Sequence, residues 1–79
     1  MKAKIVVRLK QIVHDPQGEA IYQALTHMGY TRFESVRQGK IFDIELPAMP
    51  EPEARQLLDE VGRRVLANPV IEEYSIELG

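Results

Sequence analysis

The side chains that most often do chemistry are few in this sequence, and they lie far apart. His14 and His27 stand at the two ends of a predicted helix, about 20 Å apart at ~1.5 Å rise per residue, so they cannot share a metal ion within one chain. Ser35 and Ser75 have no histidine near them in the sequence. No G-x-S-x-G motif or Walker-type glycine loop is present, and no cysteine. The sequence therefore predicts no catalytic residue and no metal site.

Two short stretches are the remaining candidates for binding, "HDPQG" at 14–18 and "RQGK" at 37–40. Asp15 and Pro16 suit the start of a helix, because an acid caps free N–H groups and proline fits the first helical position. Gly18 then falls where a glutamate would complete a capping box, and a glycine weakens the turn. Two explanations stay open: Gly18 relieves local packing, or it lets a neighbouring subunit approach the helix start.

The second stretch has the same ambiguity, since Gly39 suits a tight turn while Arg37 and Lys40 are free to contact a partner. Either stretch could attract an anion, although Asp15 would repel one. We predict a set of partner contacts from both stretches: Asp15, Pro16, Gln17, Gly18, Arg37, Gly39 and Lys40.

Hydrophobic periodicity predicts the elements that position these residues. Residues 3–10 and 70–78 alternate as strands, 32–46 as a hairpin with its turn at Gln38-Gly39, and 16–28 and 52–67 have helical spacing. The order predicts one α+β domain over residues 1–79: a βαββαβ open sandwich with a four-stranded antiparallel sheet and both helices on one face, as in ferredoxin-like folds.

The strand alternation also predicts which residues lie on each face of the sheet. The helix-covered face would hold Ile5, Val7, Leu9, Phe42, Ile44, Leu46, Tyr74 and Ile76. The open face would be charged, except for Val6 and Ile41. An apolar pair on a charged face is a candidate subunit contact, so Val6 and Ile41 are the predicted self-association residues.

Length and charge narrow the class of protein. A chain of 79 residues without disulfides buries little surface, so a single copy is only marginally stable. This favours self-association. A formal net charge of −2 argues against nucleic acid or an anionic membrane as the main partner. Charged residues interrupt the N-terminal stretch, which is unlike a signal peptide. No apolar run is long enough to span a membrane. We therefore expect a cytoplasmic protein.

Three stretches together resemble one known family. They are "LKQIVHDPQGEAIYQALTHMGY", "VRQGK" and "VLANPVIEEYSIEL", in this order and spacing. The sequence is similar over nearly its whole length to the PurS family, the small subunit of phosphoribosylformylglycinamidine (FGAM) synthase. That complex converts formylglycinamide ribonucleotide (FGAR), ATP and glutamine into FGAM, ADP, phosphate and glutamate in purine biosynthesis.

The resemblance implies a non-catalytic role within that ligase complex. A PurQ-type glutaminase would release ammonia, and a PurL-type synthetase would capture it with ATP. This chain would join the two as a homodimer or a dimer of dimers, and would support ammonia transfer. The isolated chain would be inactive and bind no cofactor, since ATP and magnesium belong to the synthetase.

Two other classes share the same order of strands and helices. An ACT-like regulatory domain that binds small molecules is the alternative function, although such domains are usually attached to an enzyme. An RNA-binding RRM would need stacking aromatic residues on the open face, where this sequence offers Ile41, Asp43 and Glu45.

Overall fold

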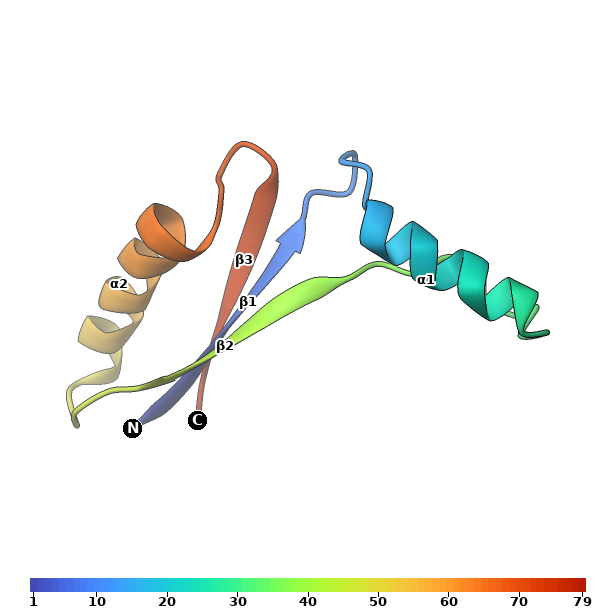
Figure 1. The fold of residues 1–79 in the computed structure, drawn as a ribbon. Coiled ribbons are helices and arrows are strands. Elements are labelled where there is room, and N and C mark those ends of the chain that lie inside the picture. The colour runs from blue at the N-terminus through green and yellow to red at the C-terminus, as the bar shows by residue number, and fades with distance from the viewer.

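The computed structural model describes all residues of the chain, Met1–Gly79. The sheet has three antiparallel strands in the order β2-β1-β3, and two helices are connected to it (Figure 1). No helix combines the length and the apolar character that crossing a membrane requires. The elements in chain order are β1 (Lys2–Leu9), α1 (Pro16–His27), β2 (Gly39–Glu45), α2 (Glu51–Val61), the π-helical turn η1 (Gly62–Leu66) and β3 (Glu72–Leu78).

The predicted four-stranded sheet is wrong, because residues 30–38 form no strand. The expected hairpin turn at Gln38-Gly39 is also absent. Gly39 begins β2, and Gly29, with φ at 93°, is the only residue with a positive φ. The chain therefore runs on through residues 30–38 into β2 instead of folding back to pair with it.

The core lies between α2 and one face of the sheet, as the strand alternation predicts. Ile5 and Val7 of β1 are fully buried, and both belong to one cluster with Leu58 of α2. Ile5 stands in register between Phe42 on β2 and Ile76 on β3, both half-buried. The period-two pattern thus fixes which face α2 covers.

The end of α2 departs from the predicted helix. A π-type bond joins the Ala67 N–H to the Gly62 carbonyl at 2.9 Å, five residues back. The wider turn rotates the following residues, so Val65 is 74% exposed instead of lying on the apolar face.

Gly62 is buried against the ring of Tyr74, where a Cβ would lie 2.9 Å from the ring carbons. The Tyr74 hydroxyl donates to Asp59 Oδ1 at 2.7 Å, which raises the pKa of Tyr74.

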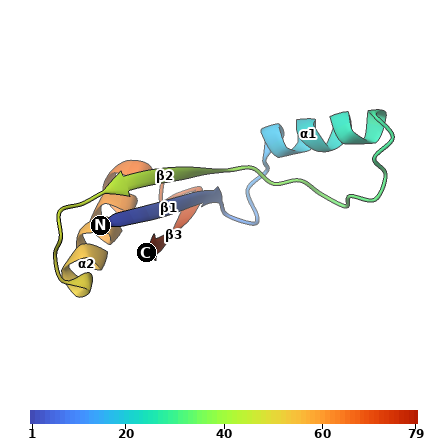
Figure 2. The same ribbon diagram turned by 90° about the horizontal axis from the view of Figure 1, so that it is seen from below.

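The expected placement of both helices on the sheet is wrong for α1. Figures 1 and 2 show α1 projecting beyond the end of the sheet, with the chain returning beside it towards β2. The radius of gyration is 16.0 Å, whereas a compact domain of this length has about 12 Å. We call residues 16–38 the arm.

The arm has a regular helix with well-formed ends. Gly29 takes the left-handed conformation after α1, and the Tyr30 N–H donates to the Leu25 carbonyl at 2.9 Å, as in a Schellman motif. The predicted apolar stripe of α1 is present, but no strand covers it. Ile21 and Met28 are 42% and 71% exposed. A helix is normally held by the burial of such a stripe, so α1 lacks its usual partner within the chain.

Candidate partner-binding site

The base of the arm is built around Asp15, the most deeply buried charged residue of the chain at 6% exposure. Its Oδ1 accepts the Gly18 N–H at 2.9 Å and so caps α1, as predicted. Its Oδ2 accepts the Gln38 N–H at 2.7 Å, from the segment that returns to β2. One carboxylate thus connects the start of α1 to the segment that returns to β2. We call residues 15–18 and 36–38 the arm junction.

Gly18 has a structural reason within the chain. A Cβ at this position would lie 2.4 Å from the Val36 carbonyl oxygen and 2.6 Å from Asp15 Oδ2. Those distances are far below van der Waals contact, and the nearer atom is backbone. The returning segment can approach the helix start only because position 18 has no side chain. The packing explanation therefore has direct geometric support, with residues 36–38 as the neighbour.

Arg37 makes the second tie of the arm junction. Its Nη2 donates to the Lys10 carbonyl at 3.1 Å and to the Val13 carbonyl at 3.0 Å, both in the loop after β1. The side chain of Gln38 adds a bond from Nε2 to Gln17 Oε1 at 2.6 Å. These contacts fix the returning segment to the loop and to α1, which explains why it does not form a hairpin with β2.

The junction also changes the acidity of Asp15. The N–H of Gln38, and next that of Gly18, lower the pKa of the Asp15 carboxyl. Burial acts in the opposite direction, and the charge of Arg37 adds a smaller lowering. Hydrogen bonds to the ionised form outweigh desolvation here, so the junction holds Asp15 as a carboxylate.

The other predicted contacts lie around this junction. Pro16 and Gln17 are exposed on the first turn of α1. Gly39 stands on β2, opposite Arg8 of β1. Lys40 points to β3 instead, where its Nζ lies 3.6 Å from Glu72 Oε2.

The predicted self-association pair is brought together by the sheet. Val6 and Ile41 are direct partners across β1 and β2. Val6 is half-buried and Ile41 is 62% exposed. They form one small apolar spot on the open face, whose role as a contact stays a prediction.

Several participants in the junction carried no signal in the sequence. The carbonyl groups of Lys10, Val13 and Val36 are backbone atoms, which every residue has. Gln38 contributes through its backbone N–H and its side-chain amide. A single glutamine belongs to no sequence motif that would predict these contacts. Only the spacing of Asp15 before Gly18 was visible, because helix capping has a sequence signature.

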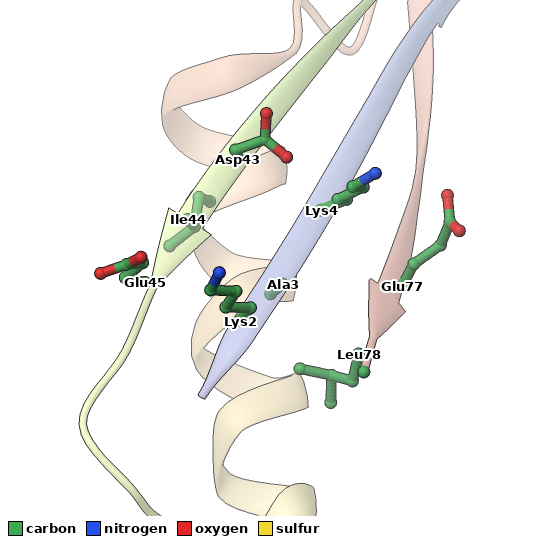
Figure 3. Close-up of a pocket in the computed structure, with 9 residues that line it drawn as sticks. Lys2, Ala3, Lys4, Asp43, Ile44, Glu45, Glu77 and Leu78 are labelled. Atoms are coloured by element: carbon green, nitrogen blue, oxygen red, sulfur yellow. The ribbon is translucent and has the colours of Figure 1, made fainter.

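The rest of the open face is a charged surface. A cavity of about 530 Å³ lies near the chain termini. Figure 3 shows five charged residues of its lining: Lys2 and Lys4 of β1, between Asp43 and Glu45 of β2 and Glu77 of β3. A basic strand thus lies between two acidic ones. Aligned stacking of two such faces would oppose like charges, which disfavours this face as a self-association surface.

Comparison with known proteins identifies the family. The sequence model described as "PurS: Phosphoribosylformylglycinamidine (FGAM) synthase" matches residues 2–79. The chain belongs to the PurS family. A curated relative from Archaeoglobus fulgidus, phosphoribosylformylglycinamidine synthase subunit PurS, is 41% identical over 76 residues, which cover 96% of this chain and 95% of the relative.

Solved PurS structures share the fold of this chain. The crystal structure of PurS from Methanocaldococcus jannaschii has a TM-score of 0.87 at 33% identity and covers 96% of this chain and 92% of that one. A chain in the structure of PurLQS from Thermotoga maritima has a TM-score of 0.87 at 30% identity, covering 96% of this chain and 93% of that one. The projecting arm is therefore part of a fold that PurS proteins share.

Proposed function

We propose that this chain is the non-catalytic subunit of an FGAM synthase complex in purine biosynthesis. The complex would convert FGAR, ATP and glutamine into FGAM, ADP, phosphate and glutamate. In it, the chain would join a PurQ-type glutaminase to a PurL-type synthetase and support ammonia transfer between them. The observation that carries this proposal is membership of the PurS family over residues 2–79, together with a close structural match to a chain of PurLQS.

The shape of the molecule supports a connecting role. The longest extent of the chain is 49 Å, so a subunit of only 79 residues presents two separated surfaces, the sheet and the arm. ATP and magnesium would act on the synthetase subunit, in the cytoplasm where nucleotide synthesis draws on its substrates. The family match does not favour the ACT-like alternative.

The isolated chain should show neither glutaminase nor ATP-dependent synthetase activity. Its serines, histidines and acids form no nucleophile and base pair of the kind that acyl or phosphoryl chemistry needs. The assay supplies FGAR, ATP and glutamine and measures FGAM and glutamate. Addition of the chain to PurL-type and PurQ-type subunits should restore the glutamine-dependent reaction.

The matched control uses ammonium chloride in place of glutamine. If the chain serves ammonia transfer, its addition should raise the glutamine-dependent rate far more than the ammonia-dependent rate. Turnover by the pure chain would contradict the non-catalytic role. An equal effect on both rates would contradict the transfer role.

We also propose that the chain self-associates, as a dimer or a dimer of dimers. The supporting observation is the apolar stripe of α1, which projects beyond the sheet with Ile21 and Met28 exposed. Sedimentation equilibrium at micromolar concentration should give a mass of at least twice 9.0 kDa. Ile21→Glu places a charge on that stripe while keeping a good helix former, and it should shift the protein towards monomer.

Two variants separate the possible contacts. Ala20→Glu adds the same charge on an exposed position outside the stripe and should leave the mass unchanged. Val6→Asp should dissociate the assembly only if the open face is the contact. A monomeric wild-type chain would refute self-association, and dissociation by Val6→Asp alone would place the contact on the sheet.

A further inference from the structure

A second cavity lies where the arm meets the sheet, and two arginines line it. Its volume is about 370 Å³. Arg8 comes from β1, Arg37 from the arm junction and Glu73 from β3. We call this cavity the arginine pocket; its polar lining also includes Gln11 and Gln38.

Arg37 is already oriented in this pocket. Both of its intramolecular hydrogen bonds leave from Nη2, to the Lys10 and Val13 carbonyls. The N–H groups on Nε and Nη1 make no hydrogen bond within the chain. A guanidinium that is held in advance loses less conformational freedom when it binds a ligand, and its free N–H groups are the donors that an oxyanion needs.

Arg8 lines the same pocket as Arg37 and comes from the end of β1. Its partner on β2 is Gly39, which has no side chain, and a Cβ there would lie 3.2 Å from Arg8 Cγ. Gly39 thus leaves space beside the Arg8 stem, and a Cβ there would also lie 2.8 Å from the Val7 carbonyl oxygen. Arg8 forms no ion pair, since the three ion pairs of the chain join Lys40 to Glu72, Arg55 to Glu51 and Arg64 to Glu60.

The charged groups around the pocket are two guanidinium groups and two carboxylates, but the carboxylates leave most of the guanidinium donors free. Glu73, the only carboxylate in the lining, stands directly opposite Arg8 in the register of β1 and β3, although the two form no ion pair. Asp15 lies near Arg37 and keeps its negative charge, but its oxygens already accept the N–H groups of Gly18 and Gln38. Two guanidinium groups and the Gln11 amide offer more donors than the two oxygens of a carboxylate can use.

We propose that the arginine pocket binds a phosphate group, held between the guanidinium groups of Arg8 and Arg37. A phosphate presents at least three oxygens, which match the free N–H donors of two guanidinium groups better than the two oxygens of a carboxylate do. The group could belong to inorganic phosphate or to a phosphate monoester. The site uses only this chain's residues, so it should be occupied without partner subunits.

The test is a titration of the ¹⁵N-labelled chain, followed by NMR at constant ionic strength. Three ligands are titrated separately: inorganic phosphate, ribose 5-phosphate, and acetate as the carboxylate. Phosphate should cause saturable shifts at the Gln38 and Gly39 amides and at Arg37 Nε–H, with acetate clearly weaker. Tighter binding of ribose 5-phosphate than of inorganic phosphate would identify a monoester as the ligand, and the reverse would identify the free ion.

Three variants test whether phosphate binding depends on the residues of the arginine pocket. Arg8→Gln changes an exposed side chain and should weaken phosphate binding at least about five-fold, as the loss of a charge-assisted pair implies. Glu73→Gln removes the opposing charge and should tighten binding. Arg32→Gln removes the same charge from an exposed arm residue outside the pocket and should have no effect.

Several results would overturn the proposal. They are shifts that never saturate, equal binding of acetate and phosphate, and an equal loss in Arg8→Gln and Arg32→Gln. Weaker binding after Glu73→Gln would also overturn it, because Glu73 would then hold a cationic group of the ligand. Circular dichroism of each variant establishes that the fold is retained.

Discussion

Replacing Gly18 with alanine should loosen the arm and lower the stability of the chain. The new methyl group would lie 2.4 Å from the Val36 carbonyl oxygen, and such overpacking costs about 1–3 kcal/mol. Alanine gains only about 1 kcal/mol over glycine from helix propensity. The difference is a net loss of up to about 2 kcal/mol, which corresponds to a fall of up to roughly 15 °C in melting temperature for a domain of this size.

The readout should separate the arm from the sheet. Amide hydrogen exchange at Gly18 and Gln38 reports the two N–H groups that Asp15 holds, and both should exchange faster in the variant. Glu19→Ala, at the next and exposed position of α1, is the matched control and should change little. A Gly18→Ala chain that is more stable than the wild type would contradict the close approach that the structure shows.

Assembly distinguishes packing from docking at the same residue. If Gly18 only admits residues 36–38, weaker assembly of Gly18→Ala with PurL-type and PurQ-type subunits should follow the loss of arm order. If a partner also contacts the helix start, Gln17→Ala should weaken assembly too. Gln17 is exposed, and its substitution removes only one hydrogen bond, to the Gln38 side chain.

Local patterns were enough to predict most of the sheet and both helices. Alternation placed Ile5 and Val7 in the core, and spacing identified α1 with its cap at Asp15 and its left-handed Gly29. These features depend on residues close together in the sequence, or on a period that any half-buried strand shows. The family resemblance, from three ordered stretches, is confirmed by the match over residues 2–79.

The prediction of a fourth strand was wrong for a physical reason. Residues 32–38 have enough polar and apolar variation to suggest a strand, and Gly39 suits a turn. What decides their conformation is non-local: Asp15 binds the Gln38 N–H and Arg37 binds the loop after β1. The sequence also contained no signal that α1 would leave the sheet, because an apolar stripe specifies burial but not which surface provides it.

Asp15 should be the residue on which the arm depends most. Asp15→Ala removes both acceptors of the arm junction and leaves the N–H groups of Gly18 and Gln38 without their partner. A buried donor that loses its acceptor bears its full desolvation cost. We expect a larger loss of exchange protection in the arm than for any other single substitution proposed here, while the β1–β3 pairing stays protected.

Asp15→Asn tests the charge separately from the shape. The amide keeps one oxygen for the Gly18 N–H, but it turns its NH₂ group towards the Gln38 N–H, so two donors face each other. The helix cap should therefore survive better than the tie to residues 36–38. Equal loss of protection at both positions would show that the two bonds form one inseparable unit.

The acid limb of stability gives the final test of Asp15. The folded state lowers the pKa of its carboxyl, mainly through the Gln38 and Gly18 N–H groups, so at acidic pH the unfolded chain binds more protons than the folded one. The stabilisation is therefore present above the carboxyl's unfolded value and is lost as the pH falls through the lower folded value. Thermal melts from pH 7 to below pH 3, in roughly unit steps, should show a steeper acid decline for the wild type than for Asp15→Asn. Asp43→Asn, on the open face of β2, should keep the wild-type slope; if it flattens the decline as much as Asp15→Asn does, general charge and not the arm junction sets the acid limit.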